Sequence, residues 1–122
     1  MKICITSEGK VLDAKVDPRF GRCQHFIFFD TETAAFEAQE NVSAQFQGGA
    51  GIQAAQLVSS KGAQAVLTGN VGPNAFETLS KAGIGIYTNV SGTVKEAIEA
   101  FKAGKYKITE SPSVGSKFGI GK

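Results

Sequence analysis

The fold is decided by residues 65–104, AVLTGNVGPNAFETLSKAGIGIYTNVSGTVKEAIEAFKAG, where short apolar runs alternate with stretches of helical spacing. The run at 65–67 predicts a buried strand, and the loop that follows it at 68–72 leads into a helix. Pro73 suits the first turn of that helix, because a residue there needs no N–H donor. Gly83 is expected to end the helix. This stretch therefore opens with a strand, a loop and a helix.

The same order repeats in the second part of the stretch. Residues 84–88 predict a short strand, and Thr93 with Glu96 forms a capping box, whose hydroxyl and carboxylate satisfy two N–H groups at a helix start. The helix ends at Gly104, and its apolar positions form one stripe: Val94, Ala97, Ile98 and Phe101. Because helices supply the crossovers, the strands of this half are expected to run parallel.

The first half adds three strands and one helix. Residues 2–6 predict a strand, and the aromatic run at 25–29 with the alternating run at 35–39 predicts a hairpin. A glycine-rich loop at 48–51 then opens a helix over 52–61. The predicted fold is α/β, with three α/β/α layers and a five-stranded mixed sheet whose first, fourth and fifth strands run parallel.

Composition limits the function more than it chooses one. The chain has 122 residues, enough for one domain, and 42% of them are hydrophobic. Its net charge of +2 gives no reason to expect nucleic acid or an acidic membrane as partner. No signal-peptide pattern and no long apolar run is present, so we expect a cytoplasmic protein that is a monomer or weak dimer. Residues 105–122, rich in Lys, Ser and Gly, are expected to form a flexible C-terminal tail.

The predicted fold also says where a ligand would bind. In parallel α/β sheets the crevice lies outside the carboxyl ends of the strands, which brings together the loops at 7–10, 68–72 and 89–92. The N–H groups of these loops and of the glycine-rich loop at 48–51 are suited to hold an anion. The alternative is that the glycines only allow tight turns and close packing.

Several nucleotide and metal chemistries are disfavoured. Residues 49–54 match the dinucleotide pattern G-x-G-x-x-A, but no convincing strand precedes them and no suitable acidic residue follows. The P-loop pattern is absent. Two-metal nuclease chemistry needs converging carboxylates, and only Glu8, Asp13 and Asp17 lie near the first strand. We therefore expect a protein that is not an enzyme.

Residues 17–25, Asp-Pro-Arg-Phe-Gly-Arg-Cys-Gln-His, hold both arginines, one of the two cysteines and the only histidine. Arg19 and Arg22 offer planar contacts to an oxyanion or sulfide face, and their charges are expected to favour the thiolate of Cys23. Cys23 and His25 are soft ligands for copper, iron or zinc. The alternative is structural: Asp17 pairs with an arginine, Cys23 packs as a small apolar residue and His25 begins a strand.

Four segments together resemble the dinitrogenase iron-molybdenum cofactor biosynthesis domain found in NifX-, NifY- and NifB-type proteins. They are Met1 to Ile5, Asp17 to Cys23, Gly48 to Ala55 and Thr68 to Ala75. The resemblance covers residues 1–104 and implies a ribonuclease-H-like fold without ribonuclease activity. It further implies a role in binding, storing or passing on metal-sulfur clusters, and small members resemble the orange-protein type, which holds a molybdenum-copper-sulfide cluster non-covalently.

The leading hypothesis is a carrier of an anionic metal-sulfide cluster, Mo-Cu-S or Fe-Mo-S, or of a precursor such as thiomolybdate. Two cysteines and one histidine cannot supply four thiolates, so the cluster has to bring its own sulfides. Arg19 and Arg22 would neutralise it, and Cys23 or His25 would supply at most one covalent contact. The predicted cradle consists of backbone at Gly48, Gly49, Ala50, Gly51, Gly69, Asn70, Val71 and Gly72. An acceptor protein is a further expected partner.

Two alternatives belong to other functional classes. The same fold and loops suit a regulatory module without metal that binds a partner protein or a small phosphorylated metabolite. An enzyme with Cys23 as nucleophile and His25 as base is the weaker alternative, because no orienting acid is evident.

Overall fold

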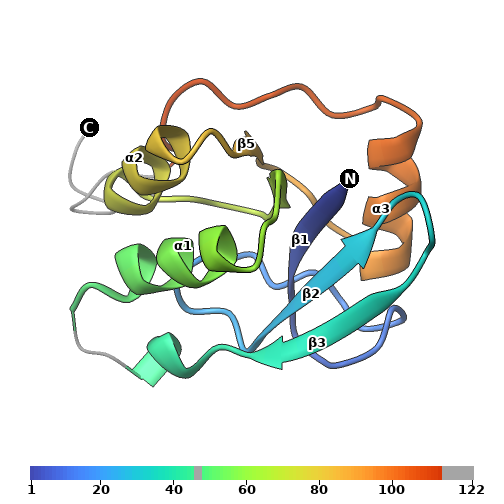
Figure 1. The fold of residues 1–122 in the computed structure, drawn as a ribbon, viewed down its shortest axis with the longest axis horizontal. Coiled ribbons are helices and arrows are strands. Elements are labelled where there is room, and N and C mark those ends of the chain that lie inside the picture. The colour runs from blue at the N-terminus through green and yellow to red at the C-terminus, as the bar shows by residue number, and fades with distance from the viewer. Residues whose placement is uncertain (46–47, 114–122) are drawn as a thin grey trace.

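The computed structural model describes residues 1–45 and 48–113. In this part of the chain, five strands form one sheet in the order β3-β2-β1-β4-β5 (Figure 1). The strands are β1 (Lys2–Ser7), β2 (His25–Asp30), β3 (Phe36–Glu40), β4 (Ala65–Leu67) and β5 (Gly85–Tyr87). The helices are the short 3-10 helix η1 (Val42–Gln45), α1 (Ala50–Ser60), α2 (Pro73–Lys81) and α3 (Val94–Lys102).

The pairing of the strands confirms the predicted mixed sheet. β1 pairs in parallel with β4, and β4 with β5, each through a helical crossover. β2 pairs antiparallel with both β1 and β3, as a hairpin requires. Every strand end lies within one residue of its predicted position, and β5 is one residue shorter than predicted at each end. β1 therefore lies at the centre of the sheet, where the parallel and antiparallel halves join.

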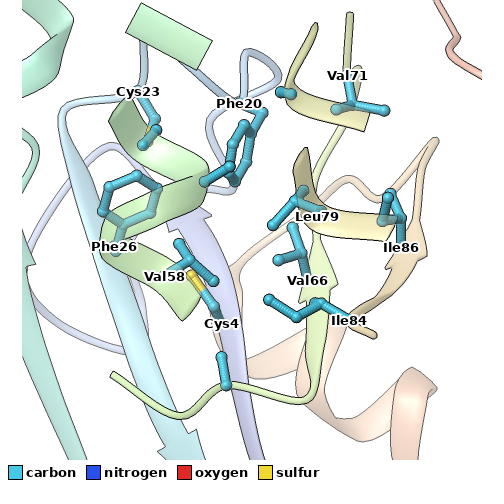
Figure 2. Close-up of a cluster of buried hydrophobic side chains, with 14 of the residues drawn as sticks. Cys4, Phe20, Cys23, Phe26, Val58, Val66, Val71, Leu79, Ile84 and Ile86 are labelled. Carbon is cyan, nitrogen blue, oxygen red and sulfur yellow. The ribbon is translucent and has the colours of Figure 1, made fainter. Parts of the chain in front are cut away.

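The helices cover both faces of the sheet, which confirms the three-layer α/β/α class. α1 and α2 lie on one face and α3 on the other (Figure 1). Successive side chains of β1 point to opposite faces of the sheet and pack in different cores. Cys4 packs toward α1 and α2, while Ile3 and Ile5 pack toward α3. Figure 2 shows the core on the α1 and α2 face, where Phe26 lies near Cys23, and Val58 lies near Cys4.

Two helical features differ from the prediction. α1 begins at Ala50, two residues before the predicted start, because Gly49 adopts a left-handed conformation (φ 74°) that turns the chain directly into the helix. The 3-10 helix η1 was not predicted at all. It is started by Asn41, whose side-chain oxygen accepts a hydrogen bond from the backbone N–H of Ser43 at 3.2 Å.

Residues 105–113, part of the predicted flexible tail, run back from α3 past β5 to α2 (Figure 1). The N–H of Thr109 donates to the carbonyl of Ile86 at 2.7 Å, and the Ser113 N–H donates to the Val71 carbonyl at 3.0 Å. The first bond holds the segment against β5, and the second joins it to the loop between β4 and α2. Residues 114–122, the rest of the predicted tail, lie outside the described residues.

The described helices give no candidate for a membrane span, because none is both long and apolar enough to cross a bilayer.

Candidate functional site

A pocket of about 570 Å³ lies where the first turns of α1 and α2 meet the loop between β1 and β2. Three segments line it: Arg19, Phe20, Gly21 and Arg22; Gly49, Ala50, Gly51 and Ile52; and Asn70, Gly72, Pro73, Asn74 and Ala75. The described lining contains no His, Cys, Asp or Glu. Its walls are therefore mainly apolar, with arginine and asparagine side chains and backbone N–H groups as the polar contacts.

The start of α1 presents backbone N–H donors at the pocket. Gly49 precedes the helix and offers no side-chain cap. The N–H groups of Ala50, Gly51 and Ile52 have no hydrogen-bond partner within the described chain. Such groups carry roughly half a positive charge at a helix N-terminus and attract anions.

The start of α2 is similar and lies directly beside it. Gly72 provides no side-chain cap, and Pro73 has no N–H. The N–H groups of Asn74 and Ala75 have no partner in the described residues. A Cβ on Gly51 would lie only 3.2 Å from the Cβ of Ala75, so the two helix starts are in contact. Two positive helix ends therefore border one pocket, where they reinforce each other on an anion.

The third wall is the loop from Asp17 to Cys23, named the arginine loop because it carries Arg19 and Arg22. A Cβ on Gly21 would lie 2.9 Å from the Cα and the N of Gly51, which shows how closely this loop rests on α1. The loop is also joined to the chain after β4, because the Asn70 N–H donates to the Pro18 carbonyl at 2.8 Å. In the same bridge, the Phe20 N–H donates to the Asn70 carbonyl at 3.2 Å. Close backbone packing therefore fixes the shape of the pocket.

Arg19 brings a fixed positive charge to the pocket. Its side chain is 60% exposed and forms an ion pair with Asp17, whose side chain is 1% exposed, with 3.3 Å between Nε and Oδ1. The hydrogen bond and the charge of Asp17 raise the pKa of Arg19 above its ordinary value. The pairing confirms the structural alternative for Asp17 and leaves Arg19 at the pocket wall.

Arg22 lies on the same wall and is exposed. Its Nη1 donates to the carbonyl of Ala44 in η1 at 2.8 Å. This contact ties the second arginine to the 3-10 helix, so both arginines of the chain border the pocket from one loop.

Cys23 lies in the core below the pocket and outside its lining. Its side chain is fully buried among Phe20, Phe26 and Val58 (Figure 2). Burial raises the pKa of the Cys23 thiol far above its ordinary value, and the charge of Asp17 adds to this effect. The expectation that the arginines favour a thiolate is therefore wrong, because desolvation outweighs their attraction. Cys4 is buried in the same core, and burial raises the pKa of its thiol as well.

His25 is placed on the other side of the sheet from the pocket. It begins β2, where it pairs with Ser7 of β1. Alternation along β2 puts His25 on the face of Ile27, which belongs to the core under α3. The described part of the chain contains no group of three or more His, Cys, Asp or Glu residues arranged to hold a metal ion.

The remaining predicted cradle residues divide between the pocket and its surroundings. Gly49, Ala50, Gly51, Asn70 and Gly72 line it. Gly48, Gly69 and Val71 do not. A Cβ on Gly69 would lie 2.7 Å from the Cα of Pro18, so this glycine serves close packing. The side chain of Val71 is buried in the core, and its N–H donates to Ser113 Oγ at 2.8 Å.

Of the three loops expected at the carboxyl ends of the strands, only the one at 68–72 lines the pocket. The loop at 89–92 is joined to it through the Asn89 N–H, which donates to the Gly69 carbonyl at 2.9 Å. The chain after β1 turns toward α3 instead, where Val16 donates to the Gly92 carbonyl at 2.9 Å. The pocket is thus shifted toward the α1 and α2 face.

Sequence reasoning missed Asn41. Its side chain is buried, and Nδ2 donates to the carbonyls of Gly21 and Cys23 at 3.1 and 2.9 Å. Asn41 also contacts the Cys23 sulfur at 3.7 Å. It therefore holds the far end of the arginine loop in place. A single asparagine after a predicted strand carries no pattern that would have revealed this role.

This chain is similar to several known proteins, three of which are the following. The apo form of the orange protein from Desulfovibrio gigas is 41% identical, with a TM-score of 0.90 over 92% of this chain and 95% of that one. A candidate NifB protein from Thermotoga, of the DUF35 family, is 40% identical, with a TM-score of 0.79 over 92% and 97%. An uncharacterised protein of Methanocaldococcus jannaschii is 30% identical over 86% of this chain and 88% of its own length.

The match to a family model covers the sheet, the three helices and every residue of the pocket. It spans residues 1–104, and its description is dinitrogenase iron-molybdenum cofactor. The chain belongs to the dinitrogenase iron-molybdenum cofactor family.

Proposed function

We propose that this protein binds and carries an anionic metal-sulfide cluster, or a thiomolybdate precursor, in the pocket between α1, α2 and the arginine loop. The observation that carries the proposal is the meeting of two uncapped helix starts with two arginines around one pocket. Each element attracts negative charge, and together they suit a multiply charged anion better than a neutral metabolite.

The lining also favours a particular kind of anion. Without thiolate, imidazole or carboxylate among the described lining residues, the protein would offer no direct bond to a metal. A cargo whose metals are already saturated by its own sulfides needs no such bond. Sulfide faces are soft and weakly hydrated, and they would pack against Phe20, Ile52 and Ala75. Clusters of the Mo-Cu-S or Fe-Mo-S type have this chemistry, which agrees with membership in the family and with the orange protein as a similar structure.

The proposed role is storage or transfer during cofactor assembly, without catalysis and in the cytoplasm. An acceptor protein would receive the cluster.

The test is an anaerobic titration of the purified protein with tetrathiomolybdate, alone and with Cu(I), followed by visible absorption. The wild type should bind about one cluster per chain. The double variant Arg19→Ala/Arg22→Ala should bind at least about tenfold more weakly, because charge-assisted hydrogen bonds contribute about 1.5–3 kcal/mol each. A matched control, Lys95→Ala/Lys102→Ala, removes the same charge from exposed positions on α3 and should bind as the wild type does.

Elemental analysis completes the test. Protein isolated anaerobically from its native cells should contain Mo, Cu or Fe together with sulfide in a fixed ratio to the chain. Metal-free protein that also fails to take up tetrathiomolybdate with copper would contradict the carrier and favour the regulatory module.

A further inference from the structure

We propose that Asp17 is a positioning residue of this pocket: it fixes the guanidinium of Arg19 and leaves the Nη1 amino group for the bound anion. The inference rests on the proposed function for the identity of the anion. Asp17 itself does not line the pocket, so it would act only through Arg19.

The carboxylate of Asp17 is built firmly into the fold. Its backbone N–H donates to the Thr6 carbonyl at 2.9 Å, and its own carbonyl accepts from Thr6 Oγ1 at 2.7 Å. These bonds anchor the residue at the carboxyl end of the central strand. Its side chain is almost completely buried, and a buried carboxylate is costly unless it is paired and hydrogen-bonded.

Within the described residues, the polar contacts of this carboxylate are all with Arg19 and Gln24. Oδ1 accepts from the backbone N–H of Arg19 at 3.1 Å and from its Nε at 3.3 Å. Oδ2 accepts from Nη2 of Arg19 at 3.4 Å and from the backbone N–H of Gln24 at 3.4 Å. Asp17 therefore holds both the backbone and one edge of the guanidinium of Arg19.

The free edge of the guanidinium is the one that a ligand would use. Nη1 of Arg19 has no partner among residues 1–45 and 48–113. An arginine side chain that is mostly exposed has many rotamers, and binding an anion with it would cost the entropy of fixing one. Because Asp17 has already fixed Nε and Nη2, that cost falls on folding instead of on binding.

A positioning role of Asp17 and simple charge attraction have opposite expected effects on anion binding. Asp17 is negative and lies behind the pocket wall, so removing its charge should strengthen anion binding if only long-range attraction matters. If Asp17 positions Arg19, removing its charge should weaken binding, because the guanidinium loses its fixed orientation. The sign of the effect separates the two roles.

The experiment uses the full chain with tetrathiomolybdate as the probe. Asp17→Asn keeps the size of the side chain and removes the charge, and it should weaken binding by about three- to tenfold, in line with charge-assisted hydrogen bonds. Asp13→Asn, at an exposed position in the preceding loop, removes the same charge and should leave the affinity unchanged. Thermal unfolding of both variants reports the integrity of the fold.

A double-mutant cycle isolates the positioning role from a general loss of structure. In an Arg19→Ala background, Asp17→Asn should leave binding unchanged or strengthen it, because no guanidinium remains to be positioned. Equal weakening in both backgrounds would mean that Asp17 only maintains the loop, and tighter binding by Asp17→Asn alone would also overturn the proposal.

A second measurement needs no ligand. The chain has two arginines, so ¹⁵N spectra show two Nε–Hε signals, which the Arg19→Ala variant assigns. The Arg19 signal should be rigid in the wild type and mobile in Asp17→Asn. A mobile Arg19 signal in the wild type would refute the positioning role. Failure of the wild type to bind tetrathiomolybdate would instead contradict the proposed function, and the spectra would still decide the role of Asp17.

Discussion

The three long helices begin in two different ways on the two faces of the sheet. At α3, Val94 and Lys95 donate to carbonyls of the loop after β1 at 2.8 and 2.9 Å. Thr93 and Glu96 complete the capping box, so the first turn of α3 is fully hydrogen-bonded. At α1 and α2, glycines occupy the N-cap positions, and the first N–H groups have no partner in the described structure.

The difference separates a structural helix start from one that is open to a ligand. A capped start gains stability from hydrogen bonds within the chain, and its dipole is already compensated. Two uncapped starts in contact give up that stability, and their donors stay available at the pocket. Capping, more than glycine content, therefore marks the side of the sheet on which a ligand is expected.

The largest effect on the pocket side of the sheet should come from Gly21→Ala, which should push the arginine loop away from α1. The added Cβ would lie 2.9 Å from backbone atoms of Gly51, which cannot move aside as a flexible side chain would. We expect the free energy of unfolding to fall by about 1–3 kcal/mol, and tetrathiomolybdate binding to weaken as the arginine loop lifts from α1. Urea unfolding and the anaerobic titration measure the two effects.

Gly48→Ala is the matched control, because a Cβ there meets no described atom within 4 Å. It should change the free energy of unfolding by less than about 0.5 kcal/mol. Equal stability of the Gly21 and Gly48 variants would show that the close contact between loop and helix is not needed.

The same contrast shows what the sequence could predict. The order of strands and helices followed from apolar periodicity and from caps, and the α3 start was predicted from the spacing of Thr93 and Glu96 alone. These inferences succeeded because each rests on residues close together in the chain. The binding roles of Arg19, Arg22 and the glycine-rich turn stay predictions, although these residues line one pocket.

Features that depend on residues distant in the chain were not predictable. The burial of Cys23 depends on packing against α1, and it raises the pKa of the thiol. The neighbouring arginines had suggested a thiolate instead. Gly69 was predicted as part of the anion cradle, whereas its closest contact is with Pro18, about fifty residues earlier. The clamp by Asn41 likewise joins two loops that no local pattern connects.

Alkaline pH should act on the pocket side of the sheet, which holds both buried thiols. Burial raises the pKa of Cys4 and Cys23 in the folded protein. Their contribution to stability is therefore complete below the thiol pKa of the unfolded chain, about 8.5, and is lost as the pH rises above it. Well above pH 8.5, the free energy of unfolding should fall by about 1.4 kcal/mol per pH unit for each thiol.

Urea unfolding at several pH values between 7.5 and 10 measures this slope. Cys23→Ala should make the slope shallower by about 1.4 kcal/mol per pH unit, which is the contribution of one thiol. An unchanged slope in that variant would mean that the Cys23 thiol ionises as readily in the folded protein as in the unfolded chain.

On the α3 face of the sheet, Thr93→Ala should destabilise the fold and leave ligand affinity unchanged. The variant loses the hydroxyl that accepts from the Glu96 N–H at 3.1 Å, which costs about 1 kcal/mol at a typical N-cap. Tetrathiomolybdate affinity should equal that of the wild type, because α3 does not line the pocket. A loss of affinity comparable to that of Arg19→Ala would place α3 in the binding site.

The smallest change in stability, and the sharpest test of the comparison, should come from closing an open helix start. Gly72 precedes α2 with an extended backbone (φ −84°, ψ 175°), which is the conformation of an ordinary N-cap. Gly72→Asp should supply the missing cap and raise the free energy of unfolding by a few tenths of a kcal/mol, since glycine is already a fair N-cap. Its carboxylate would occupy the N–H groups of Asn74 and Ala75 and would repel an incoming anion. A more stable protein with weaker tetrathiomolybdate binding is the expected result.

Gly72→Ser separates the two parts of this effect, because serine caps without adding charge. If donor availability matters, Gly72→Ser should also weaken binding, although less than the aspartate. If only charge matters, serine should leave the affinity unchanged and aspartate should reduce it. Tighter binding by both variants would contradict the comparison itself, because α2 would then bind the anion better when its first turn is already hydrogen-bonded. Weaker binding together with greater stability would show that the glycine at the start of α2 gives up stability for function.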